Sequence, residues 1–257
     1  MMISREFRGS IQKELINKQK SLLSKYTALF LGKRTFFGFL KFELINLFFS
    51  WVPGAIGFFL RKLFYPCLFQ KVGKGVIFGR NITFRHPQKI SIGDNSFIDD
   101  NVVLDAKGEN NEGIRIGENV YLGRNTILSC KEGSIFLEDY CNISANCTLI
   151  SETEVRLGKY CFLAGQCYLV AGGNHSYKNI STPIMFQPSF SKGGIKIDED
   201  VWLGAGVTVL DGVSIGKGSV VGAGSVVTRS LSEYSIAWGS PAQRIKDRRE
   251  EREPEKA

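Results

Sequence analysis

The sequence is poor in the residues that usually bind metal ions. Its 257 residues include only two histidines, His86 and His175, which lie far apart in the chain. Neither stands at a metal-ligand spacing, so a zinc site built from three histidines is not expected. We therefore expect chemistry that requires no metal. His86, which directly precedes Pro87, is expected to have a structural role.

The sequence also lacks an uninterrupted apolar run of membrane-spanning length. Its longest uncharged segment, residues 44–60, has 17 residues and contains Pro53-Gly54, whereas a spanning helix needs about 20 apolar residues. Residues 35–69 are nevertheless crowded with Phe, Leu and Ile. We interpret them as a helix, bend, helix unit that dips into one leaflet or lies along a membrane surface. A helical cap on the end of the folded domain and a simple transmembrane span are the alternatives.

Basic residues flank this apolar unit on both sides. Lys33 and Arg34 precede it, and Arg61, Lys62 and Lys71 follow it, which predicts that both ends lie on the cytoplasmic side of a membrane. A cleaved leader is not expected, because the apolar segment starts late and no small-residue cleavage pattern follows. We expect a peripheral or re-entrant monotopic protein on the cytoplasmic face of the cell membrane.

Positive charge exceeds negative charge along the chain. There are 33 Lys and Arg residues and 25 Asp and Glu residues, which give a net charge of +8. This balance suits anionic lipids or ligands that carry phosphate groups. Nucleic acid is not an expected partner, because the basic stretches contain no binding motif and no interleaved aromatic residues. The charged tail, residues 247–257, has no apolar periodicity and is expected to be solvated.

The sequence is rich in a six-residue repeat. An aliphatic residue is often followed by Gly, Asp or Ala and then by a small residue four places on, as in Ile92-Gly93-Asp94-Asn95-Ser96. Three such hexapeptides make one triangular coil, and stacked coils bury a continuous core. The repeat therefore predicts a mainly β protein built as a parallel β-helix. The aliphatic positions are Ile92, Ile98, Leu104, Ile116, Leu122, Leu128, Leu137, Ile143, Leu149, Leu157, Leu163, Leu169, Ile197, Leu203, Val209, Ile215, Val221 and Val227.

The repeat slips only after the third hexapeptide of a coil, so every insertion leaves from one corner of the predicted prism. The largest insertion, residues 171–194, is the longest loop of the repeat region, and loops of this length are usually functional or disordered. We divide the chain into an N-terminal basic and hydrophobic helical region, residues 1–74, a β-helix domain, residues 75–230, and a C-terminal segment with a charged tail, residues 231–257.

Four of the six cysteines lie four positions after an aliphatic residue of the repeat. In register they stack as two pairs on adjacent coils, about 4.8 Å apart by the spacing of neighbouring strands. We expect them to face the core as small hydrophobic residues in a reducing compartment, without disulfides or bound metal. They are Cys141, Cys147, Cys161 and Cys167.

Three motifs in a fixed order give the chain a family resemblance. Gly172-Gly173-Asn174-His175-Ser176-Tyr177 is followed by Val201-Trp202-Leu203-Gly204-Ala205-Gly206-Val207-Thr208-Val209 and then by Gly239-Ser240-Pro241-Ala242. With the repeat, they resemble the hexapeptide-repeat acyltransferases over residues 75–246, and most closely the branch of maltose, galactoside and colanic-acid O-acetyltransferases. The resemblance implies a left-handed β-helix, a homotrimer with active sites at subunit interfaces, and acetyl-CoA as the acyl donor.

The loop histidine of these enzymes is a general base, and His175 is the residue that matches it. An imidazole can take a proton from an attacking hydroxyl or amine near neutral pH, so the transfer needs no enzyme nucleophile. A backbone N–H meets the developing oxyanion, and the resemblance puts this amide at Ala205. Asn174 would orient the imidazole or touch the acceptor, and a plain turn residue is the alternative reading.

Coenzyme A would lie along the groove between neighbouring prisms, against small side chains. These small residues also suit ordinary coil packing. The chain departs from the sugar acetyltransferases at Gln243, where an arginine commonly stands, so the individual phosphate contacts stay open. The resemblance implies CoA contacts at Trp202, Ala205, Ala223, Thr228 and Arg229, and basic partners for the phosphates at Arg244 and Lys246.

Fewer residues point to the acceptor. The position that matches the acceptor-binding asparagine of the branch falls near Ser144, and Asn146 stands beside it, although Asn is favoured at turns for backbone reasons alone. We expect an O-acetyltransferase that acts on a membrane-bound or lipid-linked sugar, such as an envelope polysaccharide precursor. N-acylation of a nucleotide-linked amino sugar and a non-catalytic β-helix scaffold are the alternatives. A carbonic anhydrase of the same fold would need three histidines.

Overall fold

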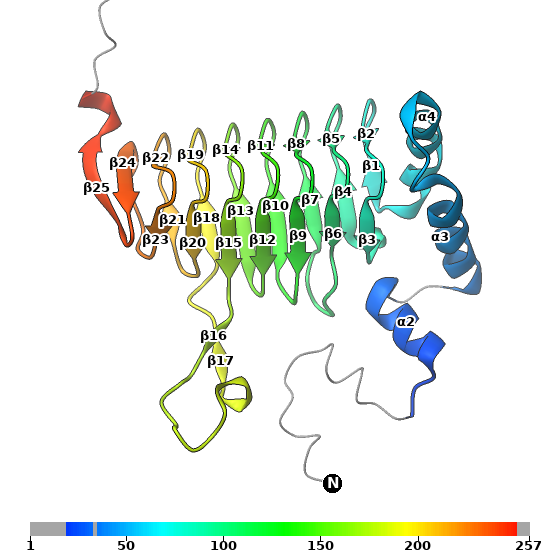
Figure 1. Ribbon diagram of the computed structural model, residues 1–257, viewed down its shortest axis with the longest axis horizontal. Helices are drawn as coiled ribbons and strands as arrows, with labels where there is room; N and C mark the ends of the chain where they lie inside the picture. Colours follow the sequence, from blue (N-terminus) through cyan, green and yellow to red (C-terminus); the bar gives the residue numbers. More distant parts are fainter. Residues whose placement is uncertain (1–18, 33–34, 251–257) are drawn as a thin grey trace, which may run out of the picture.

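Three parallel sheets form the sides of a triangular prism, as the repeat predicts (Figure 1). The computed structural model describes residues 19–32 and 35–250. The predictions for residues 1–18, for Lys33 and Arg34, and for residues 251–257 lie outside this part of the chain. Within it, successive strands turn from one sheet to the next, so each coil contributes one strand to each side of the prism.

The sheets are named A, B and C in the order in which the chain enters them. Sheet A contains β1 (Lys71–Val72), β4 (Ile90–Ile92), β7 (Ile114–Ile116), β10 (Ser134–Leu137), β13 (Glu154–Leu157), β18 (Ile195–Ile197) and β21 (Ser214–Ile215). Sheet B contains β2 (Ile77–Phe78), β5 (Phe97–Ile98), β8 (Tyr121–Leu122), β11 (Asn142–Ile143), β14 (Phe162–Leu163), β19 (Trp202–Leu203), β22 (Val220–Val221), β24 (Ser235–Gly239) and β25 (Ala242–Asp247). Sheet C contains β3 (Thr83–Arg85), β6 (Val103–Asp105), β9 (Ile127–Cys130), β12 (Thr148–Ser151), β15 (Tyr168–Ala171), β20 (Thr208–Leu210) and β23 (Val226–Val227).

The aliphatic residues of the repeat stack directly on one another inside the prism. In sheet A, Leu137 pairs with Leu157, and Leu157 pairs with Ile197 on the next coil. Leu157 is fully buried and Leu137 and Ile197 nearly so, and full burial of such a side chain contributes about 1.5–3 kcal/mol relative to exposure. The predicted β-helix and its single continuous core are therefore confirmed.

The corners of the prism differ in length. Insertions are confined to the corner between sheets C and A, where the segment between β15 and β18 is the longest. Many turns at the other two corners place an asparagine in the left-handed conformation, as at Asn95 (φ 55°), Asn125 (φ 59°) and Asn146 (φ 61°). Asparagine tolerates this conformation better than most residues do.

The stacked cysteines face the core, as predicted. The Cys141 thiol donates to the Gly158 carbonyl at 3.1 Å, and the Cys161 thiol donates to the Asp198 carbonyl at 3.0 Å. Cys147 and Cys167 are also buried. The same burial acts on Cys130 in sheet C, where it raises the pKa of the thiol to about 12.

Three helices cover the first coil (Figure 1). They are α2 (Leu22–Phe30), α3 (Phe36–Phe49) and α4 (Gly54–Phe64), and the short 3-10 turns are η2 (Tyr65–Leu68), η3 (Pro87–Lys89), η4 (Ile184–Phe186) and η5 (Arg248–Glu250). The predicted helix, bend, helix shape is confirmed, with the bend between α3 and α4. Among the described helices, none is both long enough and apolar enough to cross a bilayer.

One face of this helical unit closes the open end of the prism. Phe42 and Ile45 of α3 are buried, and the fully buried Tyr65 stacks edge-on against Phe78 and Phe84 of the first coil. The capping role, which the sequence left as an alternative, is therefore part of the structure. This capping covers only part of the apolar surface of the helical unit, because the opposite face of the unit stays exposed.

Arg61 stabilises the bend between α3 and α4 through hydrogen bonds to backbone carbonyls. The residue is 3% exposed, and its guanidinium donates to the carbonyls of Val52 at 2.7 Å, Phe49 at 3.2 Å and Phe78 of the first coil at 3.0 Å. Carbonyls at a helix end lack partners within the helix, and this one side chain satisfies two in the bend while tying the unit to the prism.

His86 has the structural role predicted for it. It is 8% exposed, and its Nε2 donates to the Ala28 carbonyl of α2 at 3.0 Å. Burial lowers the pKa of His86 below its ordinary value of 6.5. A neutral imidazole thus joins α2 to the first coil.

Candidate active site

His175 stands at the base of the long loop, in the short strand β16 (Asn174–His175). This strand pairs antiparallel with β17 (Ser189–Phe190), and Ser176 N–H donates to the Pro188 carbonyl at 2.8 Å. Gly172 (φ 120°) lets the chain turn out of the coil, and a Cβ there would lie 2.5 Å from the Glu152 side chain. The loop that carries His175 is therefore a hairpin stem with a defined exit.

The outer part of the loop folds around a buried glutamine. Gln187 is 6% exposed, and its Nε2 donates to the carbonyls of Asn179 at 2.7 Å and Thr182 at 2.8 Å. Asn179 N–H in turn donates to Gln187 Oε1 at 3.3 Å. The loop tip has its own polar core and projects away from the prism (Figure 1).

The base of the loop is held by a buried carboxylate that the sequence analysis did not single out. Asp211 is 5% exposed and accepts a hydrogen bond from Asn174 Nδ2 at 2.7 Å on the outgoing strand. On the returning strand it accepts from the backbone N–H groups of Lys192 at 2.6 Å and Gly194 at 2.9 Å. Asn174, predicted to be a catalytic or turn residue, thus points its amide at Asp211.

The imidazole of His175 is exposed, and within the described residues it makes neither a hydrogen bond nor an ion pair. Its main chain is fixed by the pairing with Ser189. An exposed, unpaired imidazole on a fixed backbone is free to meet a group that comes from outside the chain.

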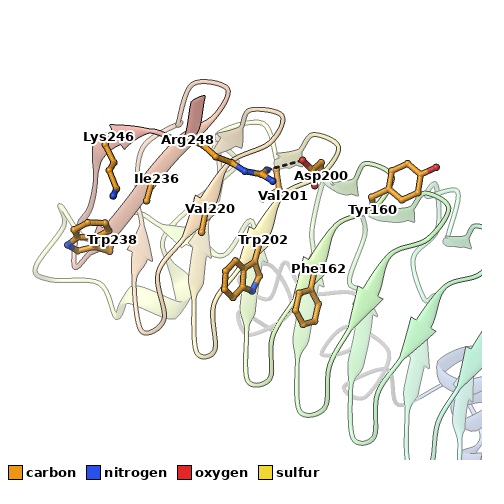
Figure 2. Close-up of a pocket in the computed structure, with 10 residues that line it drawn as sticks. All are labelled: Tyr160, Phe162, Asp200, Val201, Trp202, Val220, Ile236, Trp238, Lys246 and Arg248. Carbon is orange, nitrogen blue, oxygen red and sulfur yellow. Dashed lines mark hydrogen bonds and ion pairs between the residues drawn. The ribbon is translucent and has the colours of Figure 1, made fainter. Parts of the chain in front are cut away.

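A groove of about 630 Å³ runs along sheet B near the C-terminal end of the prism (Figure 2). Two half-exposed indoles line it, Trp202 of β19 and Trp238 of β24, with Val220 between them. The Trp202 ring stacks against Phe162 of the previous coil with 6.4 Å between ring centroids. Trp202 faces outward, as expected for an aromatic residue too large for the prism interior.

Basic side chains line one side of this groove. Lys246 of β25 reaches it from the C-terminal hairpin, and Arg248 donates to Asp200 at 2.9 Å and to the Gly218 carbonyl at 3.0 Å (Figure 2). Arg244 lies on the same hairpin but is bound to Asp247 at 2.8 Å. Hydrogen bonds from Arg249, with a smaller contribution from Arg244, hold the pKa of Asp247 well below its usual range.

Small residues occupy the corner between sheets B and C beside the groove. Ala205 and Ala223 are exposed on successive coils, and Gly224 N–H donates to the Ala205 carbonyl at 2.8 Å. The N–H of Ala205 has no acceptor within the described residues, so it is available to an external oxygen. Space around Gly224 is open, because a Cβ there would meet no atom within 4 Å.

Of the remaining predicted residues, Ser144 and Asn146 lie on this corner, whereas Thr228 and Arg229 lie at the other edge of sheet C, toward the corner with sheet A. Ser144 and Asn146 occupy the same corner two coils before Ala205, about 10 Å away by the spacing of neighbouring strands. Asn146 is a turn residue whose Oδ1 accepts from Asn125 Nδ2 at 3.0 Å. Thr228 and Arg229 are exposed directly after β23.

The predicted residues fall into two groups within one chain. Trp202 and Lys246 share the groove, and Ala205 and Ala223 share the adjacent corner. His175 and Asn174 belong to the loop at the corner between sheets C and A, and His175 does not line the groove. Trp238 and Arg248 were missed by sequence reasoning, although Trp238 directly precedes the Gly-Ser-Pro-Ala motif and was open to inspection there. Among the described residues there is no cluster of His, Cys, Asp and Glu that could hold a metal ion.

Comparisons with known proteins give this arrangement a family. Residues 194–229 match Bacterial transferase hexapeptide (six repeats), and residues 113–151 match Hexapeptide repeat of succinyl-transferase. A probable macrolide acetyltransferase of Lysinibacillus sphaericus is 34% identical over 124 residues, which cover 42% of this chain and 68% of the relative. The chain belongs to the hexapeptide-repeat acetyltransferase family.

Other family members share a smaller part of their length with this chain. A probable acetyltransferase of Mycobacterium tuberculosis is 31% identical over 52% of this chain and 44% of the relative. A galactoside O-acetyltransferase of Lactococcus lactis is also 31% identical, over 37% of this chain and 44% of its own length. The chain therefore spans less than half the length of these two curated relatives.

Two solved structures of acyltransferases are similar over most of the chain. AntD, an N-acyltransferase from Bacillus cereus crystallised with dTDP and 3-hydroxybutyryl-CoA, has a TM-score of 0.51 and 25% identity, covering 74% of this chain and 89% of AntD. The polySia-specific acetyltransferase NeuO has a TM-score of 0.50 and 25% identity, covering 73% of this chain and 90% of NeuO. The chain is thus similar both to an enzyme named as an O-acetyltransferase and to one named as an N-acyltransferase.

Proposed function

We propose that this protein is an acetyl-CoA-dependent O-acetyltransferase that modifies a hydroxyl group of a membrane-bound or lipid-linked sugar. The observation that carries the proposal is an exposed imidazole, that of His175, on a hairpin stem fixed by backbone pairing. A base held in this way can meet a hydroxyl and an acyl donor that both come from outside the chain.

The groove on sheet B suits coenzyme A chemically. Trp202 and Trp238 offer apolar faces to the adenine or the pantetheine arm. Lys246 offers positive charge to the phosphates, and Arg248, which is ion-paired with Asp200, lies in the same groove. The small corner at Ala205 and Ala223 leaves room for the thioester end of a narrow arm. Acetyl-CoA as donor is further supported by AntD, which is similar in fold and holds an acyl-CoA.

The chemistry follows from these groups. His175 takes the proton of the acceptor hydroxyl while that oxygen attacks the thioester carbonyl carbon. The N–H of Ala205 donates to the oxygen that becomes negative in the tetrahedral state. The C–S bond then breaks, and the imidazolium returns the proton to the leaving sulfur. The products of this transfer are the acetyl ester and free CoA, and no covalent acyl-enzyme intermediate forms.

A homotrimer would bring the two groups of residues together. The outward residues of sheet A include Arg115, Arg156 and Lys196. Its outward Phe136 is covered by Arg115 and Arg156, so sheet A exposes no large apolar side chain. Sheets B and C instead expose Ile127, Tyr168, Leu210, Phe162 and Trp202. Apolar surface on two adjacent faces of a prism suits a three-fold ring in which sheet B of one chain meets sheet C of the next. In that ring His175 of one subunit serves the groove of its neighbour.

The helical unit suggests where the acceptor is. The outer face of α2, α3, α4 and the bend between α3 and α4 exposes twelve large apolar side chains. Residues 19–80 contain ten basic residues and one acidic residue, Glu43, which accepts from the Tyr26 hydroxyl at 2.6 Å. An apolar patch with a basic surround suits an anionic membrane surface. We therefore propose peripheral attachment at the cytoplasmic face of the cell membrane. The exposed side chains are Leu22, Leu23, Phe36, Phe37, Leu40, Leu44, Leu47, Phe48, Trp51, Ile56, Phe59 and Leu63.

N-acylation of a nucleotide-linked amino sugar is the second candidate. The similarity to AntD, an N-acyltransferase crystallised with dTDP, favours it. The same base and groove would serve an amine acceptor. A water-soluble acceptor, however, gives no role to the exposed apolar face of the helical unit.

The test is acetyl transfer by the full-length protein from acetyl-CoA labelled in the acetyl group. One reaction contains a membrane lipid extract and a second contains nucleotide-linked amino sugars, and mass spectrometry identifies the products. We expect an acetylated lipid-linked sugar, and a loss of about 10²-fold or more in rate for His175→Ala, since a positioned general base contributes that much. Glu118→Ala, at an exposed turn between sheets A and B, is the control. Labelled amino sugar alone would favour N-acylation, and absence of CoA binding would support a scaffold.

A further inference from the structure

We propose that Asp211 is a positioning residue for His175: a buried carboxylate that ties together the two strands of the loop and so fixes the place of the base. The inference rests on the proposed function for its effect on catalysis. We call the hydrogen bonds from both strands of the loop to Asp211 the clasp. Its presence can be tested without any acceptor.

The position of Asp211 in the prism sets it apart. Leu210 pairs with Val170, so Asp211 continues the column that holds Cys130, Ser151 and Ala171 on the preceding coils. Those three residues are small and buried, as is usual inside this prism. The one coil that puts a carboxylate in this column is the coil that receives the long loop.

A buried carboxylate is costly unless hydrogen bonds satisfy it. Asp211 takes part in no ion pair within the described residues, and all of its donors belong to the loop. Oδ2 accepts from Asn174 Nδ2 at 2.7 Å, Lys192 N–H at 2.6 Å and Ser191 Oγ at 3.4 Å. Oδ1 accepts from Gly194 N–H at 2.9 Å. The charge is therefore compensated only when both strands of the loop are in place.

The geometry connects this clasp to the base. Asn174 is the residue directly before His175, and it lies 37 positions from Asp211 in the sequence. If its amide were released, the outgoing strand would still pair with β17 and donate from Ser176 N–H to Pro188, but these contacts join it only to the other strand of the loop. The bond from Gly173 N–H to Glu152 at 2.9 Å would then hold the outgoing strand to the prism. Misplacement of a catalytic group by about 1 Å is enough to cost roughly 10²-fold in rate.

The decisive variant is Asp211→Asn, which keeps the size of the side chain and replaces one acceptor oxygen with a donor. Three N–H donors and one hydroxyl then face a single acceptor. Asp105→Asn is the matched control, because Asp105 is similarly buried at the same corner of an earlier coil. It pairs with Lys107 and Arg85 and with no residue of the long loop, residues 171–194. Asn174→Ala is a second variant that removes one donor of the clasp from a partly exposed position.

The first readout is hydrogen–deuterium exchange of the backbone amides. We expect Asp211→Asn to raise exchange at residues 174–176 and 192–194 by about 10-fold or more, with the sheets unchanged, and Asp105→Asn to leave the loop unchanged. Unchanged loop exchange in Asp211→Asn would overturn the clasp. If Asp211→Asn loses protection throughout the molecule, that variant has a fold defect and Asn174→Ala replaces it. Raised loop exchange in Asn174→Ala then supports the clasp, and unchanged loop exchange overturns it.

The second readout is kinetic. We expect Asp211→Asn to lower kcat roughly 10- to 100-fold and to leave KM for acetyl-CoA unchanged, because the groove lies on another face. Asn174→Ala combined with Asp211→Asn should cost little more than either change alone. An unchanged kcat in an active protein with a loosened loop would refute the catalytic part. An inactive wild-type protein with the expected exchange pattern would refute the proposed function and leave the clasp standing.

Discussion

At the scale of single residues, the two histidines have opposite environments. His175 is exposed at the base of the loop and has no side-chain partner within the described residues, whereas His86 is buried and donates to Ala28. The sequence already distinguishes them: His175 follows Gly-Gly-Asn in a motif that resembles the acyltransferases, and His86 precedes a proline. The environment of His86 also gives the molecule a dependence on pH.

We expect acid to destabilise the protein partly through His86. Burial lowers its pKa below 6.5, so the unfolded chain binds this proton more readily, and stability falls as pH drops from about 6.5 toward the folded pKa. His86→Asn removes this proton, and Asn tolerates the φ of 52° found there. The melting temperature of the variant should fall less between pH ~7 and ~5 than that of the wild type, as followed by circular dichroism. His175→Asn is the control, and parallel curves for His86→Asn and wild type would contradict the prediction.

At the scale of elements, the C-terminal hairpin builds one side of the groove. β24 continues sheet B by pairing parallel to β22, and β25 turns back along it antiparallel. This pairing puts Ile236 beside Val220, and Trp238 and Lys246 line the same groove (Figure 2). The repeat does not extend into these strands, so its period gave no guide to the hairpin.

We expect Trp238→Ala to weaken binding of acetyl-CoA about 10-fold, since stacking of a base on an aromatic ring contributes about 1–3 kcal/mol. The value of kcat should not change, because Trp238 lies away from the loop that bears the base. Isothermal titration calorimetry with CoA measures the effect directly. Trp51→Ala removes another exposed indole, in the helical unit, and serves as the control. Equal affinities for Trp238→Ala and wild type would mean that CoA binds elsewhere.

At the scale of the whole molecule, the helical unit and the loop leave the prism in different places. The helices cover its N-terminal end, the groove lies near its C-terminal end, and the loop projects from one corner between them (Figure 1). A membrane at the outer face of the helices would therefore lie at one end of the prism. The groove stays accessible to a water-soluble donor.

We expect the full-length protein to sediment with vesicles that contain anionic lipid. Replacing Phe37, Phe48 and Phe59 with Ser should weaken binding about 10-fold or more, because each contributes apolar area. These side chains are 80%, 56% and 64% exposed, so the fold should tolerate the change. Ile180→Ser, at a 99% exposed loop residue, is the control. Undiminished binding by the triple variant, or self-association without vesicle binding, would contradict the proposed membrane surface.

Much of the fold was predictable because the repeat acts locally. A period of six residues decides which side chains point inward, and the phase breaks mark the corner where loops leave. The stacking of Cys141 on Cys161 and the exit of the long loop after Ala171 follow from that count alone. His175, Trp202 and Lys246 were identified through motifs, and the structure puts the last two in one groove.

What the sequence by itself determined is the coil: its core, its register and the residues that carry the family motifs. The tertiary structure alone decided which apolar residues of the helical unit cap the prism and which stay exposed, since helix packing chooses one face. It also decided that Trp238 joins Trp202 and that Asp211 holds Asn174, 37 residues away. These contacts join different coils or elements. Stacking of the coils brings together side chains that are far apart in the chain, and their separation depends on the length of the loops between them. A local period of six residues does not encode that length.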